Sequence, residues 1–479
     1  MDIESDFISS WKNLSIRGKI FFWKFSNKDS FGEGTIFDGF LGSESRQPTQ
    51  DEFKVMLKNI ISTVKIENNW NHEKDIKQLL WFRNIEEISL SFITLKDNFN
   101  LELLSTLPKL KKLKLEGYIR FQDLSFFTNL KELSVETDRY VVDLEPISLL
   151  HNLEKLELEI KSEGNYDDFD ITSLCKLKNL TELSIYSNHS NDLSPLKNLS
   201  KLKVLKLNYI DCNKPSRPID ISFIGNLDLK VLIIYSNSQI DYQPVSKNIN
   251  LEELTLQGGQ INLDLLIPLK KIKYLKVIGN KEYDRTENII GLNHLTELEY
   301  LFLDYYSHRL EIDFSFLSKN QKLKKLRLFG PNPSENHLSF VSELHSLKDL
   351  VIGDNKKIDD LSFLEKLTNL CCLSLINLEN LTTLKSISSL KNLKFLKLTN
   401  SPLINDISPI GELSNLENLE ISGLEHIIGA QELVKLKSIK RISTNNSHEN
   451  GGFFIAKSNF EKEASLKLYL EKLKYLVKR

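Results

Sequence analysis

Two short groups of residues in this 479-residue chain have side chains that metal ions bind. Cys371 and Cys372 are adjacent thiols, and Asp167, Asp168 and Asp170 place three carboxylates within four positions. Successive side chains of a strand point to opposite faces, so the two thiols cannot both reach one ion from a strand. We therefore expect structural cysteines and an acidic loop, and we predict no metal site.

Catalytic motifs are missing from the sequence. It has no H-E-x-x-H, G-x-S-x-G or C-x-x-C pattern, and its nine histidines are scattered. Gly32, Gly34 and Gly39 have the wrong spacing for a phosphate-binding loop, and no Lys-Ser/Thr follows them, so they are predicted to lie in turns. We therefore expect a protein that is not an enzyme and has no cofactor, with a site that binds its ligand without chemically changing it.

An apolar triplet of the form L-x-x-L-x-L recurs sixteen times and supplies the framework for such a site. The first triplet starts at Ile85 and the last at Ile439, with successive starts 20 to 27 residues apart. A period of this length indicates a solenoid, because one unit cannot bury its apolar edge alone. Each triplet predicts a short parallel strand whose leucines point inward and whose intervening residues form one continuous face. Ile61-Val64-Ile66 is a degenerate seventeenth triplet.

A second pattern, D-φ-S-x-φ, follows the strand in at least eight repeats. Its aspartates are Asp123, Asp143, Asp170, Asp192, Asp220, Asp313, Asp360 and Asp406. Asp or Ser at this place caps a short helical turn, and Pro at the next position suits the first turn of a helix. The few residues available predict an outer wall of short helical turns instead of long helices.

Together the two patterns resemble leucine-rich repeat proteins of the short-repeat class, such as internalins and regulators of protein phosphatase 1, over about residues 85–445. The resemblance implies an α/β solenoid, a curved arc with a parallel sheet on its concave face and short helical turns on its convex face. It also implies binding of a macromolecule, without catalytic residues. The family places Asn three residues after the last strand leucine, and here only Asn188, Asn237, Asn280 and Asn355 match. We therefore expect an irregular asparagine ladder.

The outward positions of the strands change from charged to aromatic along the chain. Repeats two to four carry neighbouring Lys and Glu residues, such as Lys112 and Glu132, which is typical of a solvated face. From the fifth to the eleventh repeat, aromatic and basic residues occupy these positions or lie just beyond the strand ends. They are Tyr186, Tyr209, Tyr235, Tyr274, Lys276, Tyr300, Phe302, Tyr305, Tyr306, Arg309, Arg327 and Phe329. Because protein interfaces are enriched in exposed aromatics and Arg, these residues are the predicted protein-binding site. Mutual packing of large side chains across strands is the alternative interpretation.

The longest repeats carry their extra residues directly after the strand. These insertions lie at 161–169, 211–219, 281–289, 305–312 and 331–337. We expect all of them on one rim, beside the aromatic positions. Insertions gathered on one face often mark the binding side of a repeat protein.

Residues outside the repeats are predicted to cover the ends of the solenoid, whose terminal leucines need shielding from water. The expected domains are an N-terminal α+β cap or small accessory domain at 1–84, the repeats at 85–445, and a C-terminal cap at 446–479. The last segment contains an amphipathic helix, in which Leu466 and Leu470 begin an apolar stripe opposite a Lys-rich face. Docking of this helix onto a partner is the alternative to capping.

Charge and targeting signals narrow the partners and the compartment. The formal net charge is −2, whereas nucleic-acid binders usually carry a basic surplus, so no nucleic acid is expected. There is no signal-peptide pattern, no run of 18 apolar residues and no plausible disulfide framework among four cysteines. We expect a cytoplasmic protein without a membrane association.

These observations predict a non-catalytic scaffold that binds a partner protein through its concave face and one loop rim. The expected role is that of an inhibitor, immunity protein or sensing subunit in a bacterial complex, and the hetero-complex forms through the concave face or the C-terminal helix. Two alternatives stay open: residues 1–84 act as an effector that the repeats target, or the chain is an internalin-like adhesin. An enzyme would need a site within residues 1–84 or one built across repeats.

Overall fold

A computed structural model describes most of the repeats and little outside them. The described residues are 63–66, 80, 85–91, 101–117, 119–137, 143–160, 170–187, 192–208, 219–236, 239–258, 261–279, 290–304, 314–330, 338–424, 427–444 and 453–456. The chain divides into two compact units, Met1–Ser216 and Arg217–Arg479, and each is described by itself.

The first unit alternates strands with single helical turns. Its strands are β1 (Thr63–Ile66), β2 (Glu87–Ser91), β3 (Lys112–Glu116), β4 (Glu132–Thr137), β5 (Lys155–Ile160), β6 (Glu182–Ser187) and β7 (Val204–Asn208). Its turns are the α-helical α6 (Glu102–Ser105) and α7 (Glu145–Ser148) and the 3-10 turns η1 (Phe121–Phe126), η2 (Thr172–Lys176) and η3 (Ser194–Asn198). No described helix of this unit exceeds six residues, as the short connections predict.

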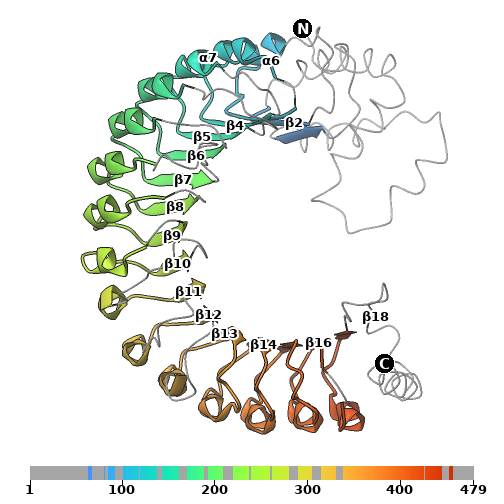
Figure 1. The fold of residues 1–479 in the computed structure, drawn as a ribbon. Coiled ribbons are helices and arrows are strands. Elements are labelled where there is room, and N and C mark those ends of the chain that lie inside the picture. Colours follow the sequence, from blue (N-terminus) through green and yellow to red (C-terminus); the bar gives the residue numbers. More distant parts are fainter. Residues whose placement is uncertain are drawn as a thin grey trace, which may run out of the picture. The chain divides into compact units, whose positions relative to one another are not determined.

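The second unit repeats the same plan with 3-10 turns alone in its described part. Its strands are β8 (Val231–Tyr235), β9 (Glu253–Gln257), β10 (Tyr274–Ile278), β11 (Tyr300–Asp304), β12 (Lys325–Phe329), β13 (Asp349–Asn355), β14 (Cys372–Leu378), β15 (Phe395–Thr399), β16 (Asn418–Ser422), β17 (Arg441–Thr444) and β18 (Phe453–Ala456). Its turns are η4 (Ser222–Asn226), η5 (Gln243–Lys247), η6 (Leu263–Leu266), η7 (Ile290–His294), η8 (Ser315–Lys319), η9 (Ser339–Glu343), η10 (Ser362–Leu364), η11 (Lys385–Ser389), η12 (Ser408–Glu412) and η13 (Ala430–Lys435). Within each unit the strands line one side and the turns line the other (Figure 1).

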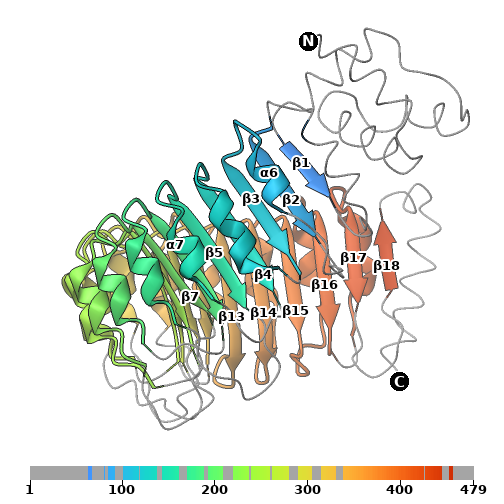
Figure 2. The same ribbon diagram turned by 90° about the horizontal axis from the view of Figure 1, so that it is seen from above.

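Leucine columns form the core of each unit. In the second unit, β10 and β11 are parallel, with Leu275 beside Leu301 and Val277 beside Leu303. All four side chains are at most 1% exposed. The same register repeats on the neighbouring strands, and the arrows of β13 to β17 run in one direction in Figure 2. Each repeat therefore buries its apolar edge against its neighbours, as a solenoid requires.

Two further strands, one near each end of the chain, pair with the repeats; the first was expected and the second was not. β1 pairs in parallel with β2, with Val64 beside Ile88 and Ile66 beside Leu90, which confirms the strand expected from the seventeenth triplet, while Ile61 lies outside the described residues. β18 was not predicted, and it runs antiparallel to β17, with Ile455 beside Ile442 (Figure 2). An antiparallel strand needs no crossover helix or turn, so it departs from the repeat plan.

Aspartates cap most of the turns that the D-φ-S pattern predicts. The Ser222 N–H donates to Asp220 Oδ1 at 2.7 Å, and the Ser408 N–H donates to Asp406 Oδ1 at 2.8 Å. The bond from the Ser222 N–H, followed by that from its hydroxyl, lowers the pKa of Asp220. The prediction is wrong for Asp123, which lies inside η1 and forms an ion pair with Arg120 at 3.0 Å because the turn starts two residues earlier.

The asparagine ladder is irregular and shifted from its expected place. Of the four predicted positions only Asn355 is described, and its Oδ1 accepts the Lys357 and Ile358 N–H groups at 2.8 and 3.1 Å. A separate ladder joins three strand ends: Asn400 Nδ2 donates to Asn377 Oδ1 at 2.9 Å, and Asn377 Nδ2 donates to Asp354 Oδ1 at 2.6 Å. All three ladder residues have left-handed backbone conformations, which Asn and Asp tolerate better than other side chains do.

Candidate functional site

Seven of the twelve predicted site residues lie together on one face of the second unit. They are Tyr235 on β8, Tyr274 and Lys276 on β10, Tyr300 and Phe302 on β11, and Arg327 and Phe329 on β12, and we call this set the aromatic array. Tyr186 is on β6 of the first unit, so it is not part of this set. Tyr209, Tyr305, Tyr306 and Arg309 lie outside the described residues, as do the predicted rim insertions except Ile219.

The period of two along each strand directs the array outward. On β11, Leu301 and Leu303 are buried, whereas Tyr300 and Phe302 between them are half-buried. Parallel pairing then aligns Lys276, Phe302 and Arg327 side by side on three consecutive strands. The leucines thus fix which side chains face outward, and the strand register fixes which of them meet.

Tyr274 and Tyr300 form a parallel stack across β10 and β11. Their ring centroids are 4.1 Å apart and their planes are parallel. Burial, followed by the neighbouring phenol of Tyr300, raises the pKa of Tyr274 to about 12. Tyr274 therefore keeps its proton at neutral pH and presents a neutral hydroxyl.

Lys276 extends across a strand to reach two aromatic rings. Its Nζ lies 5.3 Å from the ring centroid of Tyr235 and 5.1 Å from that of Phe302, and it donates to Tyr235 Oη at 3.2 Å. A cation at this distance from a ring is attracted by the electron-rich ring face. β9 lies between β10 and β8, and the small Thr255 at the level of Lys276 leaves room for this reach.

Phe302 and Phe329 extend the array to β12, and a glycine on β13 makes space for them. The two rings are 5.7 Å apart with a 35° tilt. A Cβ on Gly353 would lie 2.5 Å from two ring carbons of Phe329, so only glycine lets that ring lie across β13. The sequence reasoning missed Gly353, although a glycine inside a strand is itself a signal of close approach.

We expect Gly353→Ala to displace the Phe329 ring and weaken partner binding about tenfold, with little change in melting temperature, because the clash is with a half-buried side chain and not with the backbone. That loss equals about 1.4 kcal/mol. The measurement is partner affinity in Gly353→Ala, Phe329→Ala and the double variant. If Gly353 acts through Phe329, the double variant binds no worse than Phe329→Ala alone. An additive loss would contradict this role.

Arg327 completes the array and is only loosely paired. Its Nη2 lies 3.6 Å from Asp349 Oδ2, beyond ordinary hydrogen-bond distance. Its Nε is buried and has no hydrogen-bond partner among the described residues. The guanidinium therefore keeps donor capacity.

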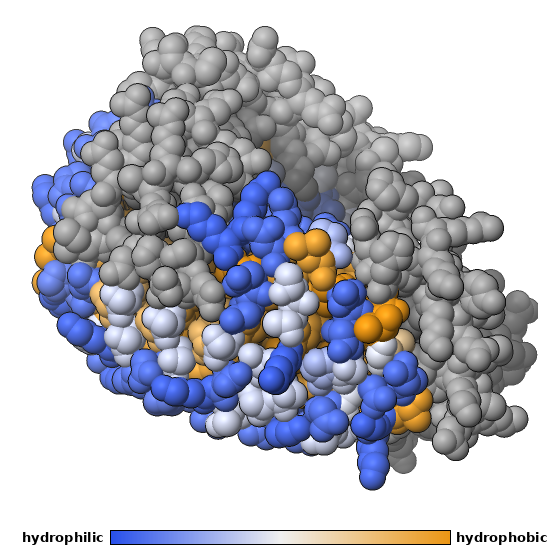
Figure 3. All heavy atoms as spheres, turned by 60° about the horizontal axis from the view of Figure 1, so that its bottom comes forward, coloured by the Kyte–Doolittle hydropathy of each residue, from blue (hydrophilic) through white to orange (hydrophobic). Residues whose placement is uncertain are grey.

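Mutual packing of these aromatic residues is observed, and their role as a protein-binding site stays a prediction. The rings do pack on one another across strands, yet all seven array residues remain half-buried and keep accessible surface. More exposed large apolar side chains elsewhere are spread over several repeats: Phe126, Leu149, Ile249, Ile267, Leu403, Ile428 and Val434. On the face drawn in Figure 3, orange spheres accordingly show as separate spots among blue and pale ones in the described part. Scattered apolar residues of this kind are normal for a protein surface.

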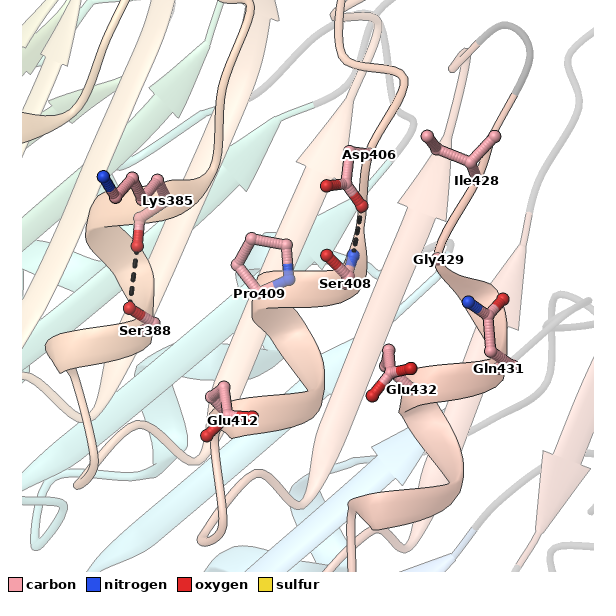
Figure 4. A pocket seen from close by; sticks show the side chains of 10 residues that line it. All are labelled: Lys385, Ser388, Asp406, Ser408, Pro409, Glu412, Ile428, Gly429, Gln431 and Glu432. Atoms are coloured by element: carbon pink, nitrogen blue, oxygen red, sulfur yellow. Dashed lines mark hydrogen bonds between the residues drawn. The ribbon is translucent and has the colours of Figure 1, made fainter.

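An open groove of about 630 Å³ crosses the outer wall at η11, η12 and η13 (Figure 4). Its three carboxylates already have partners: Asp406 caps η12, and Glu412 and Glu432 both form ion pairs with Lys435. Gly429 has φ +80°, and a Cβ there would lie 2.6 Å from the Ser408 nitrogen. The groove is therefore explained by close packing of neighbouring turns.

Other candidate chemistry gains no support in the described part of the chain. No three His, Cys, Asp or Glu side chains of the described residues gather as a metal site would need. Burial, followed by the charge of Asp349, raises the pKa of the Cys372 thiol, which disfavours a reactive thiolate. Asp170 caps η2, while Asp167 and Asp168 lie outside the described residues. No described helix is long and apolar enough to span a membrane.

Comparison with known proteins shows the fold. No protein-family model and no curated protein matches this chain. Among solved structures, a leucine-rich repeat protein of Leptospira interrogans is 20% identical with a TM-score of 0.56, over 83% of this chain and all of that one. An internalin of Listeria monocytogenes is 19% identical with a TM-score of 0.42, over 78% of this chain and 89% of that one. The expected leucine-rich repeat architecture is thereby confirmed.

Proposed function

We propose that this chain, a leucine-rich repeat solenoid, is a non-catalytic recognition scaffold that binds a partner protein through the aromatic array. The observation that carries the proposal is the array itself: stacked tyrosines, two phenylalanines and two cations on adjacent strands, all still accessible to a partner. Such residues dominate the energetics of protein interfaces.

Preorganisation makes this face suitable for binding. The Tyr274–Tyr300 stack and the contacts of Lys276 with two rings hold the side chains in place before a partner arrives. A partner then loses less binding energy to side-chain ordering, which costs about 0.5–1.5 kcal/mol for each mobile side chain. Rings that already touch also present one continuous area instead of separate contacts.

The outward face of the first unit has a different character. Lys112 pairs with Glu132 at 2.7 Å, and Lys155 pairs with Glu182 at 3.2 Å. Within each of these exposed ion pairs the two charges compensate each other, and the face stays hydrated, as the alternating charges predict. We therefore place the binding site on the second unit.

We also propose that the segments flanking the repeats act chiefly as caps, with boundaries at 1–84, 85–445 and 446–479. β1 extends the parallel sheet beyond the first full repeat. β18 ends the parallel series, because its antiparallel pairing with β17 occupies the free edge of that strand. Covered edges limit unwanted pairing with other chains.

Cross-linking of the native complex tests the proposed function. The tagged full-length protein is purified from its own cells and treated with an amine-reactive cross-linker, and the linked peptides are identified by mass spectrometry. We expect links from the exposed Lys325 of β12 to one partner protein, but not from Lys112 or Lys155 on the first unit. Links concentrated on the first unit or on the outer turns would contradict the proposal.

A further inference from the structure

The middle outward column of the aromatic array carries positive charge without negative charge. From β9 to β13 the register aligns Thr255, Lys276, Phe302, Arg327 and Val351 in this column. One cation thus lies on each side of Phe302, and no carboxylate occupies this column between β9 and β13. A partner that covers the array must therefore compensate this positive charge.

Lys276 lacks a counter-charge in the described structure. Its ammonium contacts Tyr235 Oη and two ring faces, and no carboxylate oxygen of the described residues lies within ion-pair distance. While water reaches the face, solvation and the rings stabilise this charge. Under a bound partner, water is lost and two rings alone compensate a full charge poorly.

Arg327 on the other side of Phe302 has only its long contact with Asp349, at 3.6 Å. One such contact leaves most of the five N–H donors of a guanidinium available. Neighbouring strands are about 4.8 Å apart, so Lys276 and Arg327 start from strands about 10 Å apart. One carboxylate above Phe302 would lie within reach of both long side chains.

We infer that the partner presents an acidic side chain, Asp or Glu, above Phe302, where Lys276 and Arg327 receive its carboxylate. This inference rests on the proposed function and specifies the chemistry of the bound segment: an apolar or aromatic surface with an acidic residue at its centre. Charge pairing across an interface mainly sets specificity and the association rate, so the acidic residue selects the partner and the rings hold it. A protein carboxylate is favoured over nucleic-acid phosphates, because the chain has a net charge of −2 and the column offers two cations instead of a basic track.

Selection from a peptide library tests the inference even while the identity of the partner is unknown. Phage-displayed random dodecapeptides are selected on the immobilised full-length protein, and the enriched peptides are synthesised for binding measurements in solution. We expect a recurring Asp or Glu. We also expect Lys276→Met and Arg327→Met each to weaken binding about tenfold or more, because Met keeps an apolar stem and removes the charge.

Control variants distinguish loss of charge recognition from a general disruption of the binding surface. Replacing the acidic residue of the peptide by its amide should weaken binding to the wild-type protein but not to a variant that carries both Lys276→Met and Arg327→Met. Lys397 is the matched control, since it occupies the same column on β15 but pairs with Glu420 at 3.3 Å, so Lys397→Met should leave affinity unchanged. Melting temperatures of all variants confirm folding.

Each other outcome has a defined meaning. No enrichment, enriched peptides without an acidic residue, or binding unaffected by Lys276→Met would overturn the inference. Tight binding of a single-stranded RNA dodecamer that Lys276→Met abolishes would overturn it in favour of phosphate recognition. If Tyr300→Ala with Phe302→Ala also leaves peptide binding intact, the proposed function fails as well. If that pair abolishes binding and Lys276→Met does not, only the acidic partner residue is excluded.

Discussion

Replacing both Tyr300 and Phe302 with alanine is expected to weaken partner binding about 100-fold or more and to lower the melting temperature by only a few degrees. Each aromatic hot-spot residue contributes about 2 kcal/mol to binding, and about 1.4 kcal/mol corresponds to a factor of ten. The stability cost is smaller because both side chains are half-buried and the leucines between them stay in the core. Loss of the stacked pair costs about 0.5–1.5 kcal/mol.

Phe395→Ala is the control for this double variant. Phe395 occupies the outward column of Tyr300 and is also half-buried, but it lies on β15 outside the aromatic array. Isothermal titration with the purified partner and thermal melts of each variant give the two quantities needed. An equal loss of affinity in Phe395→Ala, or a double variant that fails to fold, would contradict our assignment of the site.

Gly291→Ala is expected to cause the largest loss of stability. Gly291 lies in η7, and a Cβ there would be 1.8 Å from the Leu263 carbonyl oxygen and 2.7 Å from its carbonyl carbon. These are backbone atoms, so the clash can be relieved only by separating η7 from the neighbouring η6. Overpacking typically costs about 1–3 kcal/mol. Because this clash is with the backbone, we expect the free energy of unfolding to fall by about 3 kcal/mol or more.

Gly225→Ala supplies the matched comparison. It places the same methyl group in another 3-10 turn, η4, where the nearest atom is Cδ of Lys247 at 2.9 Å. A flexible lysine moves aside easily, so this variant should lose less than about 1 kcal/mol. Denaturant unfolding of both variants measures the contrast, and similar losses would show that close packing of the turns does not decide stability.

The leucine period made the inside and outside of each strand predictable. Phe302 was expected on the outer face because Leu301 and Leu303 flank it, and the structure confirms this. The pairing of Val64 and Ile66 with β2 followed from the same period. These features depend on backbone alternation and strand register, which the sequence pattern determines directly.

Side-chain reach and local exceptions were not predictable from that pattern. Lys276 could bend toward several neighbours, and its contact with Tyr235 two strands away depends on the small Thr255 between them. Gly353 gains a role only when the Phe329 ring leans across β13, which is a rotamer choice that the sequence does not specify. β18 runs antiparallel to β17 and lies outside the repeats, so the repeat pattern does not predict it.

Site-specific photo-cross-linking tests the central claim, that the aromatic array is the partner-binding face. A photoreactive phenylalanine analogue replaces Phe302 in one version of the full-length protein and Phe395 in another, and both are irradiated in the native cells. We predict that position 302 forms a covalent adduct with one partner protein, that position 395 does not, and that Tyr300→Ala reduces the adduct. Equal labelling from both positions, or labelling from position 395 alone, would contradict the claim.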